Sequence, residues 1–394
     1  MEIPEIPEIQ IIIPLICNHL SDKNKIRLVS TCKTLLSYRS QIKYTYNYGY
    51  TYMAVSHLPF IGNIKHINYR STRGSKGLTD HQKKYVTDLY IEDSSLVREI
   101  PHRVDTLCIA CDALPITITN NVETLYYGQN FNRTVIIPST VKYLTFGYWY
   151  NQPTILPHGL ECIRFGWCFN QPIILPDTTI RLEFDGMFNQ PIILNNGIRS
   201  VQFGDCFNQN IHIPGSMCSV LFGHDFNRRV TFEPGIKSIV FGDSYNFDTI
   251  LPETVVGVVF GQAFNQPIVI PNGVKALRFG DNFNQHIIIP ESVVVLTFGG
   301  GFMQTPYLPY VTTLTVYNTH LKREYIPNVT ELWLWLYADH EGWETCIPES
   351  AEYVIFNFNL DEPLEGKLPK NVKRVRVSRF YNHPHVPGVE YLVQ

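Results

Sequence analysis

Residues 260–271 read Phe-Gly-Gln-Ala-Phe-Asn-Gln-Pro-Ile-Val-Ile-Pro, and variants of this stretch recur every 19 residues between Tyr127 and Met303. Each copy begins with an aromatic residue, which glycine follows in nine of the ten copies, Asp185 being the exception. A second aromatic residue comes four positions later. Asparagine follows that residue in every copy except the last, where Met303 stands. Self-similarity at a fixed period of about 20 residues predicts a solenoid of stacked coils.

The pattern within one copy predicts how a coil is built. Leu277-Arg278-Phe279 alternates apolar and polar residues, as a half-buried strand does. The glycine after the strand lets the backbone either take a positive φ or approach the next coil closely. The second aromatic residue is expected to point back inside. Prolines such as Pro267 and Pro271 then disfavour a helix and favour an extended return leg. The length of a coil points the same way, because 19 residues cannot hold a strand, two turns and a helix of about 11–12 residues.

The asparagine column has a structural explanation. In a stacked coil, its side-chain amide can pair with backbone groups of the adjoining coil that no strand ladder reaches, and buried polar groups must be paired. We therefore interpret the Phe, Asn and Gln columns as scaffold rather than as an active site.

The Phe-Asn-x-Pro-Ile core, at Phe169–Ile173, Phe188–Ile192 and Phe264–Ile268, resembles the FNIP repeat. The FNIP repeat is related to leucine-rich repeats. It is typical of large protein families in social amoebae and in giant viruses that infect amoebae. The resemblance implies a β-rich solenoid of leucine-rich-repeat type, with 19-residue coils, one parallel sheet and extended return legs.

Residues 1–43 have a helical pattern instead. Pro14 can open a short helix, and Ser21 or Asp22 can cap a second one whose apolar residues follow a helical spacing. The segments Ile16–Leu20 and Ile26–Lys33 resemble an F-box, although the family's Leu-Pro-x-Glu opening is absent. The resemblance implies docking on a Skp-type adaptor. The docking residues would be Pro14, Leu15, Leu20, Ile26, Leu28 and Val29. The alternative is a plain helical cap for the solenoid.

The chain as a whole divides into five parts. Residues 1–43 form the F-box-like helical segment, 44–62 a tyrosine-rich linker or cap, 63–126 irregular N-terminal coils, 127–303 the FNIP repeats, and 304–394 irregular C-terminal coils and a cap. The strand pattern begins at Ile64-x-x-Ile67-x-Tyr69 and ends at Val389-x-x-Leu392. Arg70–Lys84 is expected to be an inserted polar loop.

Composition excludes several classes of function. The formal net charge of −3 does not favour nucleic acid or anionic membranes, and no run of about 20 apolar residues can span a bilayer. No nucleotide-binding, serine-hydrolase or zinc-protease motif occurs. The lone Cys108-x-x-Cys111 pair lacks the partners of a zinc site, so we interpret the cysteines as buried free thiols. We expect no catalytic, cofactor or metal residues, and a cytoplasmic location, in the host cytoplasm if the protein is viral.

The expected target-binding face is the solvent side of the sheet. The position before the first aromatic residue holds Leu221, Val240 and Val259 in three successive coils, beside small neighbours. An exposed apolar patch with a polar rim indicates an interaction site, and Arg164, Arg181 and Arg278 would form that rim. The alternative is that the three aliphatic residues only pack as a ladder between coils.

Together these features predict the substrate-recognition subunit of a cullin-type (SCF-like) ubiquitin ligase. The F-box would dock on the Skp adaptor, and the solenoid would bind a target protein. The alternative is a stand-alone scaffold for protein–protein interaction that has no ligase.

Overall fold

The computed structural model describes residues 50–58, 61–71, 78–92, 100–110, 118, 121–336, 342–358 and 360–393. The helical segment expected over residues 1–43, with all six expected adaptor-binding residues, lies outside this range. The chain divides into two compact units, residues 1–166 and 167–394, which are described separately below as the first and the second unit.

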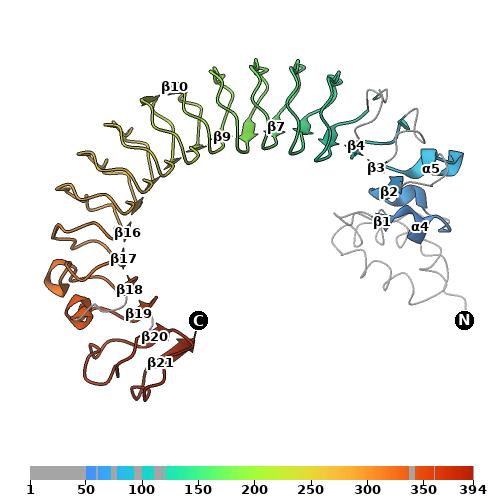
Figure 1. The fold of residues 1–394 in the computed structure, drawn as a ribbon. Helices are drawn as coiled ribbons and strands as arrows, with labels where there is room; N and C mark the ends of the chain where they lie inside the picture. Colours follow the sequence, from blue (N-terminus) through green and yellow to red (C-terminus); the bar gives the residue numbers. More distant parts are fainter. Residues whose placement is uncertain are drawn as a thin grey trace, which may run out of the picture. The chain divides into compact units, whose positions relative to one another are not determined.

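The first unit is a parallel sheet in which each strand pairs with the next along the chain. Two short helices and one 3₁₀ turn join its first strands (Figure 1). The elements are β1 (Tyr50–Thr51), α4 (Tyr52–Val55), η2 (Ile61–Asn63), β2 (Ile67–Ser71), α5 (Asp80–Tyr85), β3 (Asp88–Ile91), β4 (Thr106–Ile109), β5 (Thr124–Tyr127), β6 (Tyr143–Thr145) and β7 (Cys162–Phe165).

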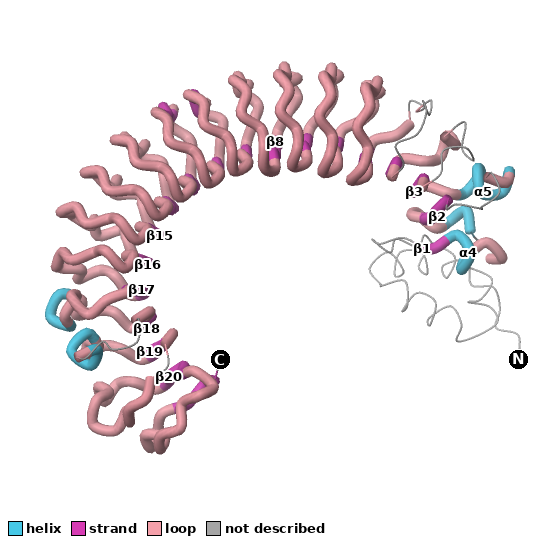
Figure 2. Tube along the Cα trace, viewed as in Figure 1, coloured by secondary structure: helices cyan, strands magenta, loops and turns pink. Residues whose placement is uncertain are grey.

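The second unit repeats the same plan in a longer array. Its strands pair in parallel in chain order, except that β10 and β12 form a separate parallel pair on the return legs. Within this unit the main strands line the inner side of a curve, and loops make up most of every coil (Figures 1 and 2). The strands are β8 (Arg181–Phe184), β9 (Ser200–Gln202), β10 (Ile211–Ile213), β11 (Ser219–Leu221), β12 (Val230–Phe232), β13 (Ser238–Val240), β14 (Gly257–Val259), β15 (Ala276–Arg278), β16 (Val295–Thr297), β17 (Thr313–Val316), β18 (Glu331–Leu334), β19 (Tyr353–Phe356), β20 (Arg374–Val377) and β21 (Glu390–Val393), and the 3₁₀ turns are η4 (Arg323–Tyr325) and η5 (Trp343–Cys346).

Two columns of aromatic rings fill the core of the repeats. Phe203 stacks on Phe207 of its own coil, with ring centroids 3.9 Å apart, and on Phe222 of the next coil at 5.7 Å. The three side chains are at most 2% exposed. Offset stacking of this kind contributes about 0.5–1.5 kcal/mol per pair beyond the burial of apolar area. Both aromatic columns therefore point inward, as the sequence predicts.

The asparagine column joins consecutive coils. The Asn189 Oδ1 atom accepts a 2.9 Å hydrogen bond from the backbone N–H of Asn208, and the same oxygen accepts from Gln209 Nε2 at 3.0 Å. The predicted pairing with the backbone of the adjoining coil is confirmed. These asparagines are half-buried or exposed rather than buried, because they lie where the chain turns into the return leg.

The glycine after each strand is required by close packing. A Cβ atom added to Gly242 would lie 1.8 Å from the backbone oxygen of Gly223 in the preceding coil, and Gly261 would meet Gly242 at 2.1 Å. No glycine of this column has a positive φ. Of the two roles that the sequence allowed, close approach between coils is therefore the correct one.

Every strand expected from Ile64 onward is present in the described residues, but the first is displaced. Strand β2 pairs Tyr69, not Ile67, with Leu89 of β3. Part of the expected polar loop at 70–84 is also helical: α5 begins after Thr79, whose hydroxyl accepts from the Gln82 backbone while the Gln82 side chain accepts from the Thr79 backbone. This reciprocal pair is a capping box, which favours a helix start.

The interpretation of the cysteines as buried thiols is wrong for most of those described. All six are thiols rather than disulfide-bonded, but only Cys346 is buried. Cys218 is exposed, and the other four are half-buried because they lie on the solvent side of strands or in turns: Cys108, Cys162, Cys168 and Cys206. No described helix is long and apolar enough to cross a membrane.

Candidate binding surface

The solvent side of the second unit's sheet carries the three aliphatic residues singled out in the sequence. Leu221 in β11 is in register with Val240 in β13, which is in register with Val259 in β14. We call these three residues the aliphatic patch. Their strand neighbours Val220, Ile239 and Val258 point inward and are at most 2% exposed, because side chains alternate between the two faces of a strand.

The aliphatic patch is accessible to solvent. Leu221 is 38% exposed, while Val240 and Val259 are half-buried. Val240 lies between Leu221 and Val259, and Val259 lies between Val240 and Arg278. The residues beside the patch, two positions earlier in each strand, are Ser219, Ser238 and Gly257. Such small residues leave the aliphatic side chains standing above the surrounding face. The patch is thus both a ladder between coils and a partly solvent-exposed surface.

The three predicted rim arginines are not equivalent. Arg278 lies in register beside Val259, is exposed, and has no ion pair among the described residues of the second unit. Arg181 lies in β8, where its guanidinium forms an ion pair with Glu183 at 2.5 Å, so its charge is already compensated. Arg164 is exposed in β7 of the first unit. Of the three, only Arg278 adjoins the patch in strand register.

A second cluster on the same face escaped the sequence analysis. Trp333 in β18 donates to Glu331 through its indole N–H at 2.8 Å, and the Arg374 guanidinium lies 5.0 Å from the ring centroid of Tyr353. Alternation within Glu331–Leu334 and Arg374–Val377 already indicated which side chains face solvent.

Another row of aliphatic residues lies on the return legs. These side chains are 80–91% exposed and recur at one position of the repeat: Ile174, Ile193, Ile250, Val269 and Ile288. We call them the return-leg row. At the same position His212 and Thr231 interrupt the row in β10 and β12, where they hydrogen-bond to each other at 3.0 Å.

The comparisons with known proteins identify the repeats. Two stretches, residues 150–186 and 264–301, match the model of the FNIP repeat. These two stretches are similar to the FNIP repeat. Three chains of solved structures are similar in fold, and one of them is CroV588, described as a novel circular leucine-rich-repeat protein, from a giant virus.

CroV588 has a solenoid architecture similar to that of this chain. The two align with a TM-score of 0.68 and 25% sequence identity over 84% of this chain and 56% of CroV588. This chain thus spans little more than half the length of that protein. No curated protein matches the chain. The FNIP repeats and the leucine-rich-repeat-like coils fit a scaffold for protein–protein interaction.

Proposed function

We propose that the protein is an interaction scaffold that holds a target protein on the solvent side of the second unit's sheet. The observation that carries this proposal is the aliphatic patch, in which three aliphatic side chains stand in register among small residues. Solenoids present extended binding surfaces, and partly exposed apolar residues with a polar surround are typical of interaction sites.

The sheet face is favoured over the return-leg row because its residues vary from coil to coil. Along the sheet, Glu183, Gln202, Leu221 and Arg278 succeed one another at equivalent positions. The return-leg row presents an aliphatic side chain in most coils. A surface that repeats from coil to coil offers a partner several equivalent registers, whereas a varied surface can discriminate between partners.

In the finer form of the proposal, the scaffold is the substrate-recognition subunit of an SCF-like ubiquitin ligase. Its support is the resemblance of Ile16–Leu20 and Ile26–Lys33 to an F-box. The protein would then catalyse no bond change itself. It would hold a target close to the ubiquitin carrier, which raises the effective concentration of the target's lysines.

The alternative is a scaffold that acts without a ligase. It is favoured by the comparisons, since both the FNIP matches and the similarity to CroV588 concern the solenoid. The two functions differ in one requirement, because only the ligase subunit needs to bind a Skp-type adaptor.

Size-exclusion chromatography of the full chain with a purified Skp-type adaptor separates them. The ligase proposal predicts co-elution, and loss of co-elution in the double variant Leu15→Ala/Leu20→Ala, since truncating anchor residues commonly costs about 2 kcal/mol or more of binding free energy. Val240→Asp is the matched control and should still co-elute. A wild-type chain that elutes apart from the adaptor would leave the stand-alone scaffold as the function.

A further inference from the structure

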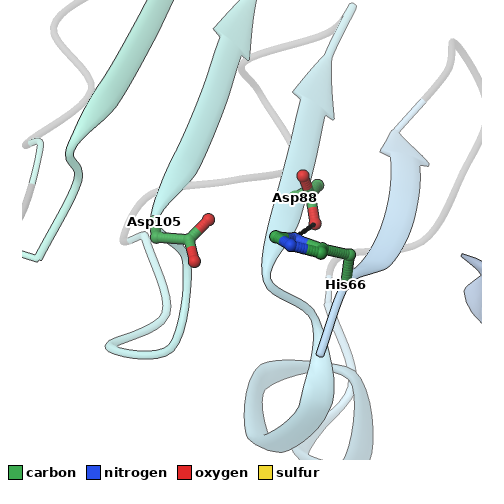
Figure 3. A group of neighbouring side chains, drawn as sticks. All are labelled: His66, Asp88 and Asp105. Atoms are coloured by element: carbon green, nitrogen blue, oxygen red, sulfur yellow. Dashed lines mark ion pairs between the residues drawn. The ribbon is translucent and has the colours of Figure 1, made fainter. Parts of the chain in front are cut away.

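Three potential metal ligands converge in the first unit, at the ends of β2, β3 and β4 where these strands begin. His66 precedes β2, Asp88 is the first residue of β3, and Asp105 precedes β4. One ring nitrogen and one oxygen of each carboxylate all lie within 4.8 Å of one another. Figure 3 shows the imidazole and the Asp88 carboxylate in contact, with Asp105 facing them from the neighbouring strand. The Nδ1 atom of His66 is 3.6 Å from Asp88 Oδ2.

The sheet and two threonines hold these side chains in place. Asp88 pairs in register with Asn68 of β2 and with Thr106 of β4, so the three strand starts are fixed relative to one another. The Thr87 hydroxyl donates to Asp88 Oδ2 at 2.6 Å and itself accepts from the Ile67 backbone N–H at 2.8 Å. The Thr106 hydroxyl donates to Asp105 Oδ1 at 3.0 Å. Hydrogen bonds of this kind orient carboxylate ligands in metal sites.

The cluster also concentrates negative charge in a partly desolvated place. The side chains of His66 and Asp88 are each 25% exposed. The carboxylates of Asp88 and Asp105 lie close together there, and the charge of Glu123 also acts on Asp105. Glu123 has its own cation, Lys142, at 3.3 Å. Asp88 and Asp105 have no lysine or arginine ion pair among the described residues, and a bound cation would offset their charges.

We propose that His66, Asp88 and Asp105 form a zinc site that links three successive coils. Zinc binds imidazole nitrogen and carboxylate oxygen at about 2.0–2.2 Å, so two of its ligand atoms lie at most about 4.2 Å apart. The 3.6 Å separation of His66 Nδ1 and Asp88 Oδ2 already satisfies this limit, and Asp105 offers an oxygen within 4.8 Å of the ligand atoms of the other two. The nitrogen ligand distinguishes this site from surface carboxylate clusters and favours zinc over magnesium or calcium.

The site's position suggests what it does for the fold. The asparagine bonds between coils occur in the 19-residue repeats, where the Asn151 backbone N–H donates to Asn132 Oδ1 in the first such step that the structure describes. The coils of β2, β3 and β4 precede these repeats and lack the asparagine column. A zinc ion held by one ligand from each coil would join them in a similar way.

Calorimetric titration of the metal-free full chain with Zn²⁺, together with thermal unfolding, tests the proposal. We expect one high-affinity site, and a Tm that rises by about 2 °C or more with Zn²⁺ and not with Mg²⁺. His66→Gln should lose this site and the Tm rise. His102→Gln, which removes an exposed histidine of the same unit, should keep both.

Asp105→Asn separates metal binding from a purely structural role. The amide keeps the size of the side chain and can still accept from Thr106, while it removes a charge that burial disfavours. We therefore expect a Tm without metal that is unchanged or higher, together with at least tenfold weaker zinc binding. Equal zinc affinity and equal Tm rise in the wild type, His66→Gln and Asp105→Asn would overturn the proposal.

Discussion

The side-chain oxygen of Asn208 accepts a 3.0 Å hydrogen bond from the backbone N–H of Asn227 in the next coil. Asn208→Ala removes this acceptor and leaves the N–H of Asn227 without its partner. We expect a loss of about 1–3 kcal/mol in the free energy of unfolding, the range for an unpaired, partly buried donor. Chemical denaturation of the full chain measures it.

Asn196→Ala is the control for that substitution, because Asn196 is exposed in a turn of the same unit. It should change stability by less than about 0.5 kcal/mol. If both variants unfold at the same denaturant concentration, the asparagine column does not stabilise the stack.

Alanine substitution should affect stability very differently at Gly242, which belongs to the glycine column, and at Gly257, which lies in β14 of the next coil. A Cβ on Gly242 would lie 1.8 Å from a backbone oxygen, which no side-chain movement can relieve, whereas nothing lies within 4 Å of a Cβ on Gly257. Gly242→Ala should therefore destabilise the array by about 3 kcal/mol or more. Gly257→Ala should be neutral or stabilising by up to about 1 kcal/mol, since alanine restricts the unfolded chain. Comparable losses in the two variants would contradict the close approach of the coils.

Glu362 gives the C-terminal coils a pH dependence. Its carboxylate contacts the Lys367 ammonium and accepts from the Trp343 indole, and both interactions hold its pKa below the usual 4.5. A carboxyl group whose pKa is lowered by folding adds stability above its unfolded pKa, and this stability is lost as the pH falls through the folded pKa. Wild type should thus exceed Glu362→Gln in Tm at pH 7, and the difference should shrink below about pH 4.5.

The comparison uses Glu365→Gln as its control, because Glu365 is exposed and has no ion pair among the described residues around it. The Tm difference between the wild type and Glu365→Gln should not shrink as the pH falls. A Tm difference between wild type and Glu362→Gln that stays constant from pH 7 to pH 3.5 would refute the assigned contacts.

The regular part of this fold was predictable because its columns recur at a constant period. Phe203, Gly204 and Asn208 each have equivalents 19 residues on, so one coil describes its neighbours. The first strand was harder to place. Ile67 and Tyr69 both fit an inward position, and a shift of two residues preserves the alternation of a strand, so only the pairing of Tyr69 with Leu89 decides the register.

The two proposed binding sites were predictable to different degrees. The aliphatic patch followed from the repeat, since alternation shows which side chains of β11, β13 and β14 face solvent. The half-burial of the patch could not be predicted from the repeat, because it depends on how closely adjacent strands bring Leu221 and Val259 to Val240. The cluster of His66, Asp88 and Asp105 was hidden, since unequal spacings of 22 and 17 residues separate its members in the irregular coils.

The most direct test of the scaffold compares the proteins captured from host-cell extract by the full chain and by Val240→Asp, with quantitative mass spectrometry. Val295→Asp is the matched control, since Val295 is a valine 41% exposed on the same face in β16, and Ile193→Asp probes the return-leg row. Each should lower stability by no more than about 1 kcal/mol. We predict that Val240→Asp captures at least tenfold less of a specific partner than the wild-type chain does. Val295→Asp and Ile193→Asp should capture that partner as the wild type does. Unchanged capture by Val240→Asp, or loss confined to Ile193→Asp, would contradict binding at the aliphatic patch.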